Sequence, residues 1–210
     1  MSTFDPACTR CPRLSNHLQQ IRQRFPDYHA GPVPAFGVEF PSLLIVGLAP
    51  GLHGANATGR PFTGDYAGIL LYETLYKYGY SNQATATHKT DGLRLVNCRI
   101  TNAVKCLPPD NKPSGDEITT CNTFLKEEIT EINGRLIILA LGRIAHNAVV
   151  KAMGLKLKNF QFGHGNCHQP APDKWLLDSY HCSRYNTQTG RLTEKMFHQV
   201  FDRIIEIRDR

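Results

Sequence analysis

The amino-acid sequence predicts an α/β fold, a three-layer α/β/α sandwich around a central, mostly parallel four-stranded sheet. Two short apolar runs, at residues 43–46 and 136–141, have the length and continuity of strands buried on both faces. Longer segments with apolar residues at helical spacing separate the strands. Strands that alternate with helices favour a parallel sheet with right-handed crossovers.

The first two helices are bounded by helix-breaking residues. One is expected to begin near Pro12, which suits a first turn, and to end before Pro26. A loop to about residue 41 follows. After the first strand and a long loop, a second helix is expected over residues 69–79, ending at Gly79.

Three later helices carry stronger start signals. Ser114 and Glu117 have the spacing of a capping box, which places Cys121 on a helix running to about residue 132. Another helix follows the strand at 136–141 and ends before Gly154. Thr193 is expected to cap the last helix, whose apolar residues repeat at helical spacing.

Two further strands complete the predicted sheet. Residues 93–102 indicate the second strand, ending at Asn102, and residues 175–180 the fourth. Residues 156–169 before the fourth strand fit a small hairpin or an irregular β segment. The chain of 210 residues is long enough for one domain and too short for two ordinary ones, so a single domain over 1–210 is expected.

Composition restricts the partners and the compartment. The formal charge of +6 and the pI near 9.0 favour a polyanion partner, although a basic protein without such a partner fits equally well. There is neither a run of about 20 apolar residues nor a secretory signal. A cytoplasmic monomer without membrane contact is therefore expected.

The seven cysteines favour metal ligation over disulfides, because their number is odd and the expected compartment is reducing. Cys8 and Cys11 form a Cys-x-x-Cys pair, and Cys106 and Cys121 lie far along the chain. Four thiolates can hold either zinc or an iron–sulfur cluster. Their spacing alone leaves both open.

Residues 47–65 form a glycine-rich loop after the first strand, in which backbone amides can approach a ligand closely. The loop matches neither a Walker motif nor a dinucleotide motif. Its composition fits an anion or base pocket, or an ordinary surface loop. The segments after the first, second and fourth strands meet at one edge of a parallel sheet, so this loop, Asn102 and His181 are expected to converge on one pocket.

Specific motifs lie in these segments. The first is Gly-Leu-Ala-Pro-Gly at 47–51 together with Gly-Arg-Pro-Phe-Thr-Gly-Asp at 59–65. The second is the segment 181–193, which begins His-Cys-Ser-Arg-Tyr-Asn, and the third is Thr-Asn-Ala-Val-Lys-Cys-Leu-Pro-Pro-Asp-Asn-Lys-Pro at 101–113. Together these motifs resemble the type-B branch (family 5) of the uracil-DNA glycosylases. The resemblance runs in the family's order from Cys8 to Thr193.

The resemblance implies a function and a cofactor. It implies a monofunctional enzyme that flips a base out of double- or single-stranded DNA and hydrolyses the N-glycosidic bond of uracil, and of other deaminated bases such as hypoxanthine and xanthine. It also implies a structural [4Fe–4S] cluster on Cys8, Cys11, Cys106 and Cys121, which would clip distant segments together.

The resemblance also assigns roles in the pocket. Phe62 would stack on the flipped base, Asn102 would read its edge, and His181 would donate a hydrogen bond to the developing oxyanion. Viewed singly, these residues are better explained as a core aromatic, a strand-end turn residue and a buried histidine. The backbone at 47–49, which comprises Gly47, Leu48 and Ala49, would line the pocket.

Ala49 stands where other branches of the family place a polar residue that manages the attacking water. Asp65 is therefore the candidate for positioning water or stabilising the cationic sugar. It is equally a helix N-cap before Tyr66.

Three residues of 181–193 are candidates for DNA contact. Tyr185 would fill the gap in the base stack, although the family often has Gln there, and Arg184 and Arg191 would reach phosphates. Exposed arginines can also be ordinary solvated charges.

Other interpretations stay open at this point. His164, Cys167 and His168, with His181 and Cys182 nearby, can be considered as a zinc set, but a polar hairpin tip explains the spacing more simply. The whole chain can also be considered as a non-catalytic nucleic-acid-binding or damage-sensing module, or as a zinc protein of unrelated function.

Overall fold

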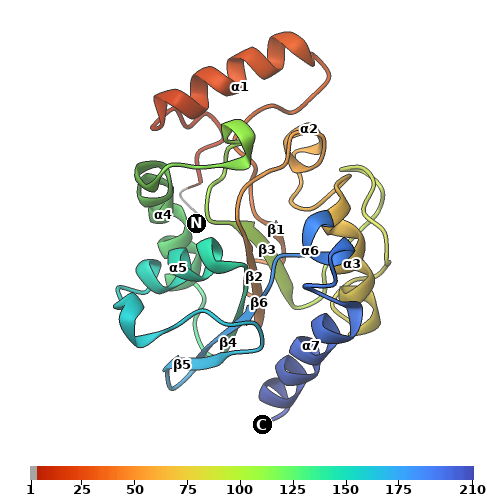
Figure 1. Cartoon of the computed structure of the whole chain (residues 1–210), viewed down its shortest axis with the longest axis vertical. Helices are drawn as coiled ribbons and strands as arrows, with labels where there is room; N and C mark the ends of the chain where they lie inside the picture. The colour runs from red at the N-terminus through yellow and green to blue at the C-terminus, as the bar shows by residue number, and fades with distance from the viewer. Residues whose placement is uncertain (1–3) are drawn as a thin grey trace.

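A computed structural model describes residues 4–210, so residues 1–3 of the predicted domain lie outside the described part. One six-stranded sheet runs through the molecule in the order β1-β3-β2-β4-β6-β5 (Figure 1). The four central strands are parallel: β3 (Cys98–Asn102), β2 (Leu43–Gly47), β4 (Leu136–Leu141) and β6 (Lys174–Ser179). The two edge strands are antiparallel: β1 (Phe36–Gly37) and β5 (Cys167–Ala171).

Helices cover both faces of this sheet, which confirms the predicted class. Figure 1 shows α4 (Gly115–Thr130) and α5 (Arg143–Ala152) on one side, and α3 (Tyr66–Lys77) and α7 (Glu194–Arg208) on the other. Strand side chains alternate between these layers. Leu43 of β2 belongs to the apolar core shared with α3 and α7, whereas its neighbour Leu44 belongs to the core shared with α4 and α5.

The sheet is larger than predicted, because both edge strands lack an apolar pattern. β1 has only two residues. β5 contains Pro170 and has no buried residue, so nothing in its sequence marks it as a strand. The hairpin that β5 forms with β6 lies at 167–179 and has an irregular register, so only the end of the segment 156–169 is β structure, and no hairpin lies within that segment.

β3 begins at Cys98, five residues later than predicted. Asn97 has φ 51°, a left-handed conformation that breaks the strand. Leu93 and Leu95 are still buried in the core, although only an isolated bridge between Ser81 and Leu95 pairs that segment. The apolar residues of this segment predicted a strand because they are buried in the core, although the segment is not part of β3.

The predicted caps are present. The Ser114 hydroxyl accepts from the Glu117 N–H, and the Glu117 carboxylate accepts from the Ser114 N–H. The Thr193 hydroxyl accepts from the Met196 N–H at the start of α7. Each such cap is worth about 1 kcal/mol.

The first helix, α1 (Pro12–Arg24), lies above the carboxyl edge of the sheet (Figure 1). Its Leu14 packs in a small apolar cluster with Cys121. The short helices were not predicted; they are α2 (Ala55–Thr58), η1 (Pro109–Asn111), η2 (Leu157–Asn159) and α6 (Arg184–Gln188). Within residues 4–210, every helix is too short or too polar to span a bilayer.

Candidate active site

A cavity of about 370 Å³ lies at the carboxyl edge of the sheet, as expected. We call it the base cavity; it is lined by Leu48, Ala49, Gly51, Ala55, Phe62, Asp65, Ala67, Asn102, Asn111, His181 and Ser183. Its volume is within the range of small-molecule pockets. All predicted catalytic residues and, except for Gly47, all predicted base-contacting residues line it.

Asn102 presents an unpaired polar atom in this region. It is the last residue of β3 and only 3% exposed, and among residues 4–210 its Oδ1 finds no hydrogen-bond partner. Such a group costs about 1–3 kcal/mol when buried. The amide therefore carries an acceptor without a partner at the wall of the cavity.

Gly47 does not line the cavity but makes room for two residues that do. A Cβ at this position would lie 2.4 Å from Asn102 Oδ1 and 2.7 Å from Phe62 Cζ. The glycine at the end of β2 is thus required by close packing, and the approach of these two side chains depends on it.

Phe62 and His181 face each other across the cavity region. Their ring centroids are 5.9 Å apart and the ring planes differ by 28°. Phe62 is 5% exposed and has φ 54°, which is unfavourable for a residue with a side chain. The Tyr72 hydroxyl donates to the Pro61 carbonyl at 2.7 Å and holds this turn in place.

His181 is held in the neutral form. Burial lowers its pKa to about 4, so at pH 7 one ring nitrogen carries hydrogen and can donate. Its backbone carbonyl accepts a 2.8 Å hydrogen bond from Asn186 Nδ2, which fixes the start of the segment after β6. A neutral imidazole in a buried site can donate to an anion without itself requiring a counter-charge.

Asp65 serves as a cap and also lines the cavity. Oδ1 accepts from the Gly68 N–H at 2.9 Å, as the N-cap interpretation predicted. Oδ2 faces the glycine turn, where a Cβ at Gly54 would lie 2.6 Å away. Burial raises the pKa of this carboxyl, and the backbone hydrogen bonds oppose that rise. The two interpretations of Asp65 are therefore compatible.

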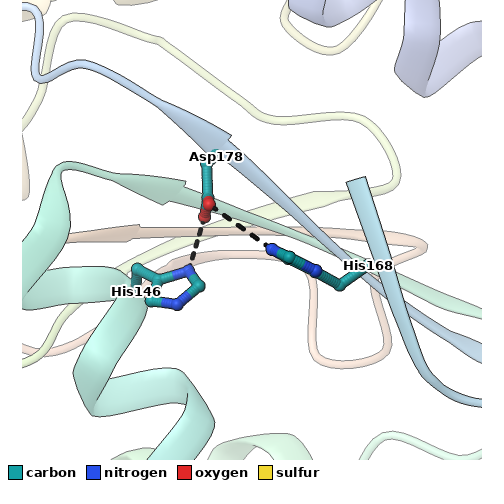
Figure 2. A group of neighbouring side chains, drawn as sticks. All are labelled: His146, His168 and Asp178. Carbon is teal, nitrogen blue, oxygen red and sulfur yellow. Dashed lines mark hydrogen bonds and ion pairs between the residues drawn. The ribbon is translucent and has the colours of Figure 1, made fainter. Parts of the chain in front are cut away.

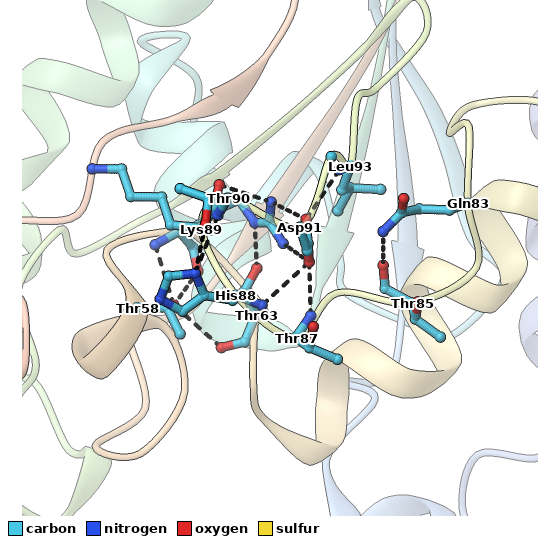
Figure 3. Close-up of polar contacts among 12 residues, drawn as sticks. Thr58, Thr63, Gln83, Thr85, Thr87, His88, Lys89, Thr90, Asp91 and Leu93 are labelled. Atoms are coloured by element: carbon cyan, nitrogen blue, oxygen red, sulfur yellow. Dashed lines mark hydrogen bonds and ion pairs between the residues drawn. The ribbon is translucent and has the colours of Figure 1, made fainter.

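A buried ion pair holds the loop that carries Phe62. Arg60 NH2 lies 2.6 Å from Asp91 Oδ2, and both side chains are nearly inaccessible. Asp91 also accepts backbone N–H bonds from Thr87 and Leu93 (Figure 3). The Arg60 hydrogen bond is the main cause that lowers the pKa of Asp91. This ion pair joins the segment 81–93 to the wall of the cavity.

Two polar lining residues, Asn111 and Ser183, were not given a role from sequence. Asn111 reaches the cavity from the turn after Pro109, with φ 55°. Ser183 lines it while its hydroxyl caps α6 by accepting from the Asn186 N–H. The Asp-Asn pair after two prolines was a signal of left-handed geometry, because Asn tolerates it.

A second hollow of about 230 Å³ shares His181 with the base cavity. We call it the arginine recess; its lining includes Arg143, Phe162, Gly163, Tyr180 and Arg191. Arg143 lies over the Phe162 ring at 5.7 Å, and Arg191 lies over the Tyr180 ring at 4.7 Å. Arg143, at the start of α5, was not predicted.

The other two predicted DNA contacts lie on α6, directly after the cavity residue Ser183. Arg184 lies over the ring of Tyr66 at 5.1 Å, and Tyr66 follows the cavity residue Asp65. Tyr185 is 69% exposed, the most exposed of the large hydrophobic residues described. An aromatic side chain held in solvent beside a cavity is available to a partner.

The four predicted ligand cysteines surround one small, mostly apolar cavity between α1 and α4; they are Cys8, Cys11, Cys106 and Cys121. The Lys105 N–H donates to Cys121 Sγ at 3.2 Å. Burial and the neighbouring thiols raise the pKa of Cys106 to about 12. Buried thiolates of this kind need a positive partner, so the donor set fits a metal group.

The zinc set considered at 164–168 is not assembled. His164 stacks on Tyr180, and Cys167 is exposed on the edge strand β5. Within the part of the chain that the structure describes, only His146, His168 and Asp178 bring three donor atoms within 4.8 Å of one another. The alternative of a polar hairpin tip is also wrong, because residues 167–168 lie in β5 and the β5–β6 connection is at 172–173.

The molecule is an α/β protein with a cavity at the carboxyl edge of its sheet, the place where ligands bind in such folds, and with arginines in the adjoining recess. Comparison with known proteins identifies the family. The profile of the Uracil DNA glycosylase superfamily matches residues 34–205. The chain belongs to this superfamily and, as the relatives below show, to its type-5 branch.

The relatives match almost over their whole length. A type-5 uracil-DNA glycosylase of Thermus thermophilus is 44% identical over 92% of this chain and 90% of its own length. Type-5 enzymes of Mycobacterium leprae and Pyrobaculum aerophilum are 40% and 37% identical, over 92% and 93% of this chain and 88% and 87% of their own lengths. The predicted family and the prediction of an enzyme of this type are confirmed.

Proposed function

We propose that this enzyme hydrolyses the N-glycosidic bond of uracil in DNA and leaves an abasic site. The observation that carries the proposal is the buried, unpartnered Oδ1 of Asn102 beside the stacked rings of Phe62 and His181. A planar base with its own donor and acceptor atoms would complete this arrangement. The type-5 relatives support uracil as that base.

The chemistry assigned to each side chain follows from its position. Phe62 offers an apolar ring face for the flipped base. Asn102 accepts from the ring N–H of uracil and donates to the adjacent carbonyl. Neutral His181 donates to the oxygen that gains negative charge as the glycosidic bond breaks, a stabilisation worth about 10²–10³ in rate.

Water is positioned from the other side of the cavity. Ala49 has no polar group, so the Oδ2 of Asp65 and the amide of Asn111 are the groups that can orient a nucleophile. The negative charge of Asp65 also stabilises the cationic sugar. Because burial raises the pKa of Asp65, this role requires a pH above that raised value.

Breadth of substrate follows from the size of the cavity. A volume of about 370 Å³ leaves room for a purine such as hypoxanthine or xanthine, and an amide can present donor and acceptor to either ring type. The base reaches the cavity by flipping out of the stack. Tyr185 fills the gap, and Arg184, Arg191 and Arg143 bind the flanking phosphates.

The four cysteines hold a [4Fe–4S] cluster in this proposal. A single zinc with bonds of about 2.3 Å would bring its sulfur ligands to about 3.8 Å from each other. Among residues 4–210, no three cysteine sulfurs come within 4.8 Å of one another, which favours a larger group. The cluster supplies a covalent clip between α1, the segment after β3 and α4, and no chemical step.

Iron analysis tests this assignment. The purified protein should be coloured and contain about four irons, and Cys106→Ser should lose iron and thermal stability. The control for iron content is Cys98→Ser, because Cys98 is a cysteine of the sheet core outside the predicted ligand set. Stoichiometric zinc in a colourless preparation would refute the cluster.

Base release tests the function. The wild-type enzyme should release free uracil from a uracil-containing duplex, and His181→Ala should reduce the rate by about 10²–10³. His17→Ala, on α1 and outside the cavity, is the matched control. If the protein retains the damaged duplex but forms no abasic site, it is the non-catalytic damage-sensing module.

A further inference from the structure

A polar cluster outside the base cavity joins three elements. Figure 2 shows Asp178 of β6 between His146 of α5 and His168 of β5. His146 and Asp178 side chains are completely buried, and their Nδ1 and Oδ1 atoms are 2.7 Å apart. His168 Nε2 lies 3.8 Å from Asp178 Oδ2. None of these residues has a part in the proposed chemistry.

The hydrogen bonds of His146 define its protonation state. Nδ1 faces the Asp178 carboxylate, and Nε2 lies 2.8 Å from the Phe160 carbonyl oxygen. Both partners are acceptors only, so each ring nitrogen must carry hydrogen if both bonds are made. The ring is then an imidazolium, and with Asp178 it forms an ion pair inside the protein.

The same geometry argues against a metal ion. His168 Nε2 donates to the Gln161 carbonyl at 3.1 Å, so its proton occupies the nitrogen that a metal would need. Asp178 Oδ2 already accepts from the Gly163 N–H at 3.2 Å. Both ring nitrogens of His146, the Nε2 of His168 and both carboxylate oxygens of Asp178 thus have partners without a cation.

This cluster supports one wall of the arginine recess. The cluster makes hydrogen bonds to Phe160, Gln161 and Gly163. Phe162 lies between these residues in the sequence, and the Arg143 guanidinium lies over its ring. Phe162 also contacts the His146 ring edge-on, with centroids 5.7 Å apart. Asp178 lies three residues before His181, which the recess shares with the base cavity.

We propose that His146 is a positioning residue whose charged form, paired with Asp178, holds Phe162 and hence Arg143 in place to bind a DNA phosphate. The inference rests on the proposed function, because it assigns DNA to the recess. When His146 loses its proton it can donate only one of its two hydrogen bonds. Either Phe160 or Asp178 then loses its partner, and the wall of the recess loosens.

Contacts of His146 with Asp178 and Phe160 favour its charged form. Burial opposes it, but the hydrogen bond and charge of Asp178 and the Phe160 carbonyl raise the pKa of His146 above its usual value. The other groups that face it in the described chain are His168 on β5 and Arg143 on its own helix, whose charge opposes the shift. The pairing is therefore complete below the unfolded-state pKa of histidine and is lost as pH rises through the raised value.

NMR of the wild-type protein tests the charge state without any variant. At pH 7 both ring nitrogens of His146 should have the shifts of protonated nitrogens, and their titration should lie above that of a free histidine. A bare nitrogen at neutral pH would overturn the proposal. So would one Zn²⁺ bound per chain that Asp178→Asn abolishes, because that result would make the cluster a metal site.

DNA affinity tests the consequence. Affinity for an undamaged duplex should fall as pH rises through the titration of His146, and Asp178→Asn should move that midpoint to lower pH. His146→Gln should weaken binding at pH 7 by roughly tenfold and act on KM rather than kcat. His17→Ala is the matched control.

A variant that loses stability but keeps the wild-type affinity and midpoint would show a merely structural role. If affinity follows His146 but no base is released, this inference stands and the proposed function fails.

Discussion

Asn102 and Lys105 are three residues apart and both almost fully buried. The charged group of Lys105 has hydrogen-bond partners, whereas the Oδ1 of Asn102 has none among the residues described. The Lys105 ammonium lies 2.7 Å from the Glu128 carboxylate of α4 and also donates to the Thr101 hydroxyl. The Oδ1 of Asn102 has no partner within residues 4–210. The comparison separates a group that is paired within the fold from one that, in the proposed function, pairs with the base.

The ion pair should give the largest effect on stability. Lys105→Met leaves the Glu128 carboxylate buried without its partner, so the free energy of unfolding should fall by about 3–5 kcal/mol. Chemical unfolding, with iron content followed in parallel, measures this. Lys105→Met with Glu128→Leu should recover most of the loss, because both charges are then gone. If the double variant is as unstable as the single one, the pairing is not what stabilises this region.

Asn102→Ala should show the opposite pattern. Uracil release should fall by about 10²–10³, since a group that meets the base and its developing charge is removed. The free energy of unfolding should not fall, because the substitution removes a buried acceptor that has no partner and that itself costs about 1–3 kcal/mol. Single-turnover kinetics and unfolding on the same samples measure both. A large loss of stability with unchanged release would reverse the roles assigned to the two residues.

Gly47→Ala tests the packing between these regions. The added methyl would collide with Asn102 and Phe62, so stability should fall by about 1–3 kcal/mol and uracil release should fall with it. Gly115→Ala is the matched control, because a Cβ there meets nothing within 4 Å. Unfolding and base release on both variants decide the matter. Equal effects in the two would mean that the close approach at Gly47 has no consequence.

The comparison also shows what could be predicted from sequence. Continuous apolar strands and helix caps are local signals, so β2, β4 and the caps at Ser114 and Thr193 were predicted. The base cavity was predicted because parallel strands place their carboxyl ends together. These features depend on neighbouring residues or on a general rule of sheets.

Features set by contacts between distant segments were not predicted. The edge strands β1 and β5 exist through pairing with β3 and β6, which their own residues do not announce. Arg143 enters the recess because Phe162, far along the chain, lies beneath its guanidinium. The pair of Arg60 and Asp91 joins two loops whose sequences show no complementarity beyond charge. Such sites can be recognised only in the folded structure, because the fold brings their residues together from separate segments.

The Asp65 side chain is both a helix cap that stabilises the fold and part of the cavity wall. Its variants should give the smallest effect on stability. Asp65→Asn keeps a good N-cap, and the free energy of unfolding should change by less than about 0.5 kcal/mol, whereas Asp65→Ala should cost about 1 kcal/mol. Both should lower uracil release, since neither retains the carboxylate.

Burial raises the pKa of Asp65, so wild-type uracil release should decline as pH falls through that raised value. The folded state gains relative stability over the same pH range, because it binds the proton more tightly than the unfolded chain. The pH profile of kcat/KM should lose this acidic limb in Asp65→Asn. If the asparagine variant keeps full activity and the same acidic limb, Asp65 is only a helix cap, and the water must be positioned by another residue that lines the cavity.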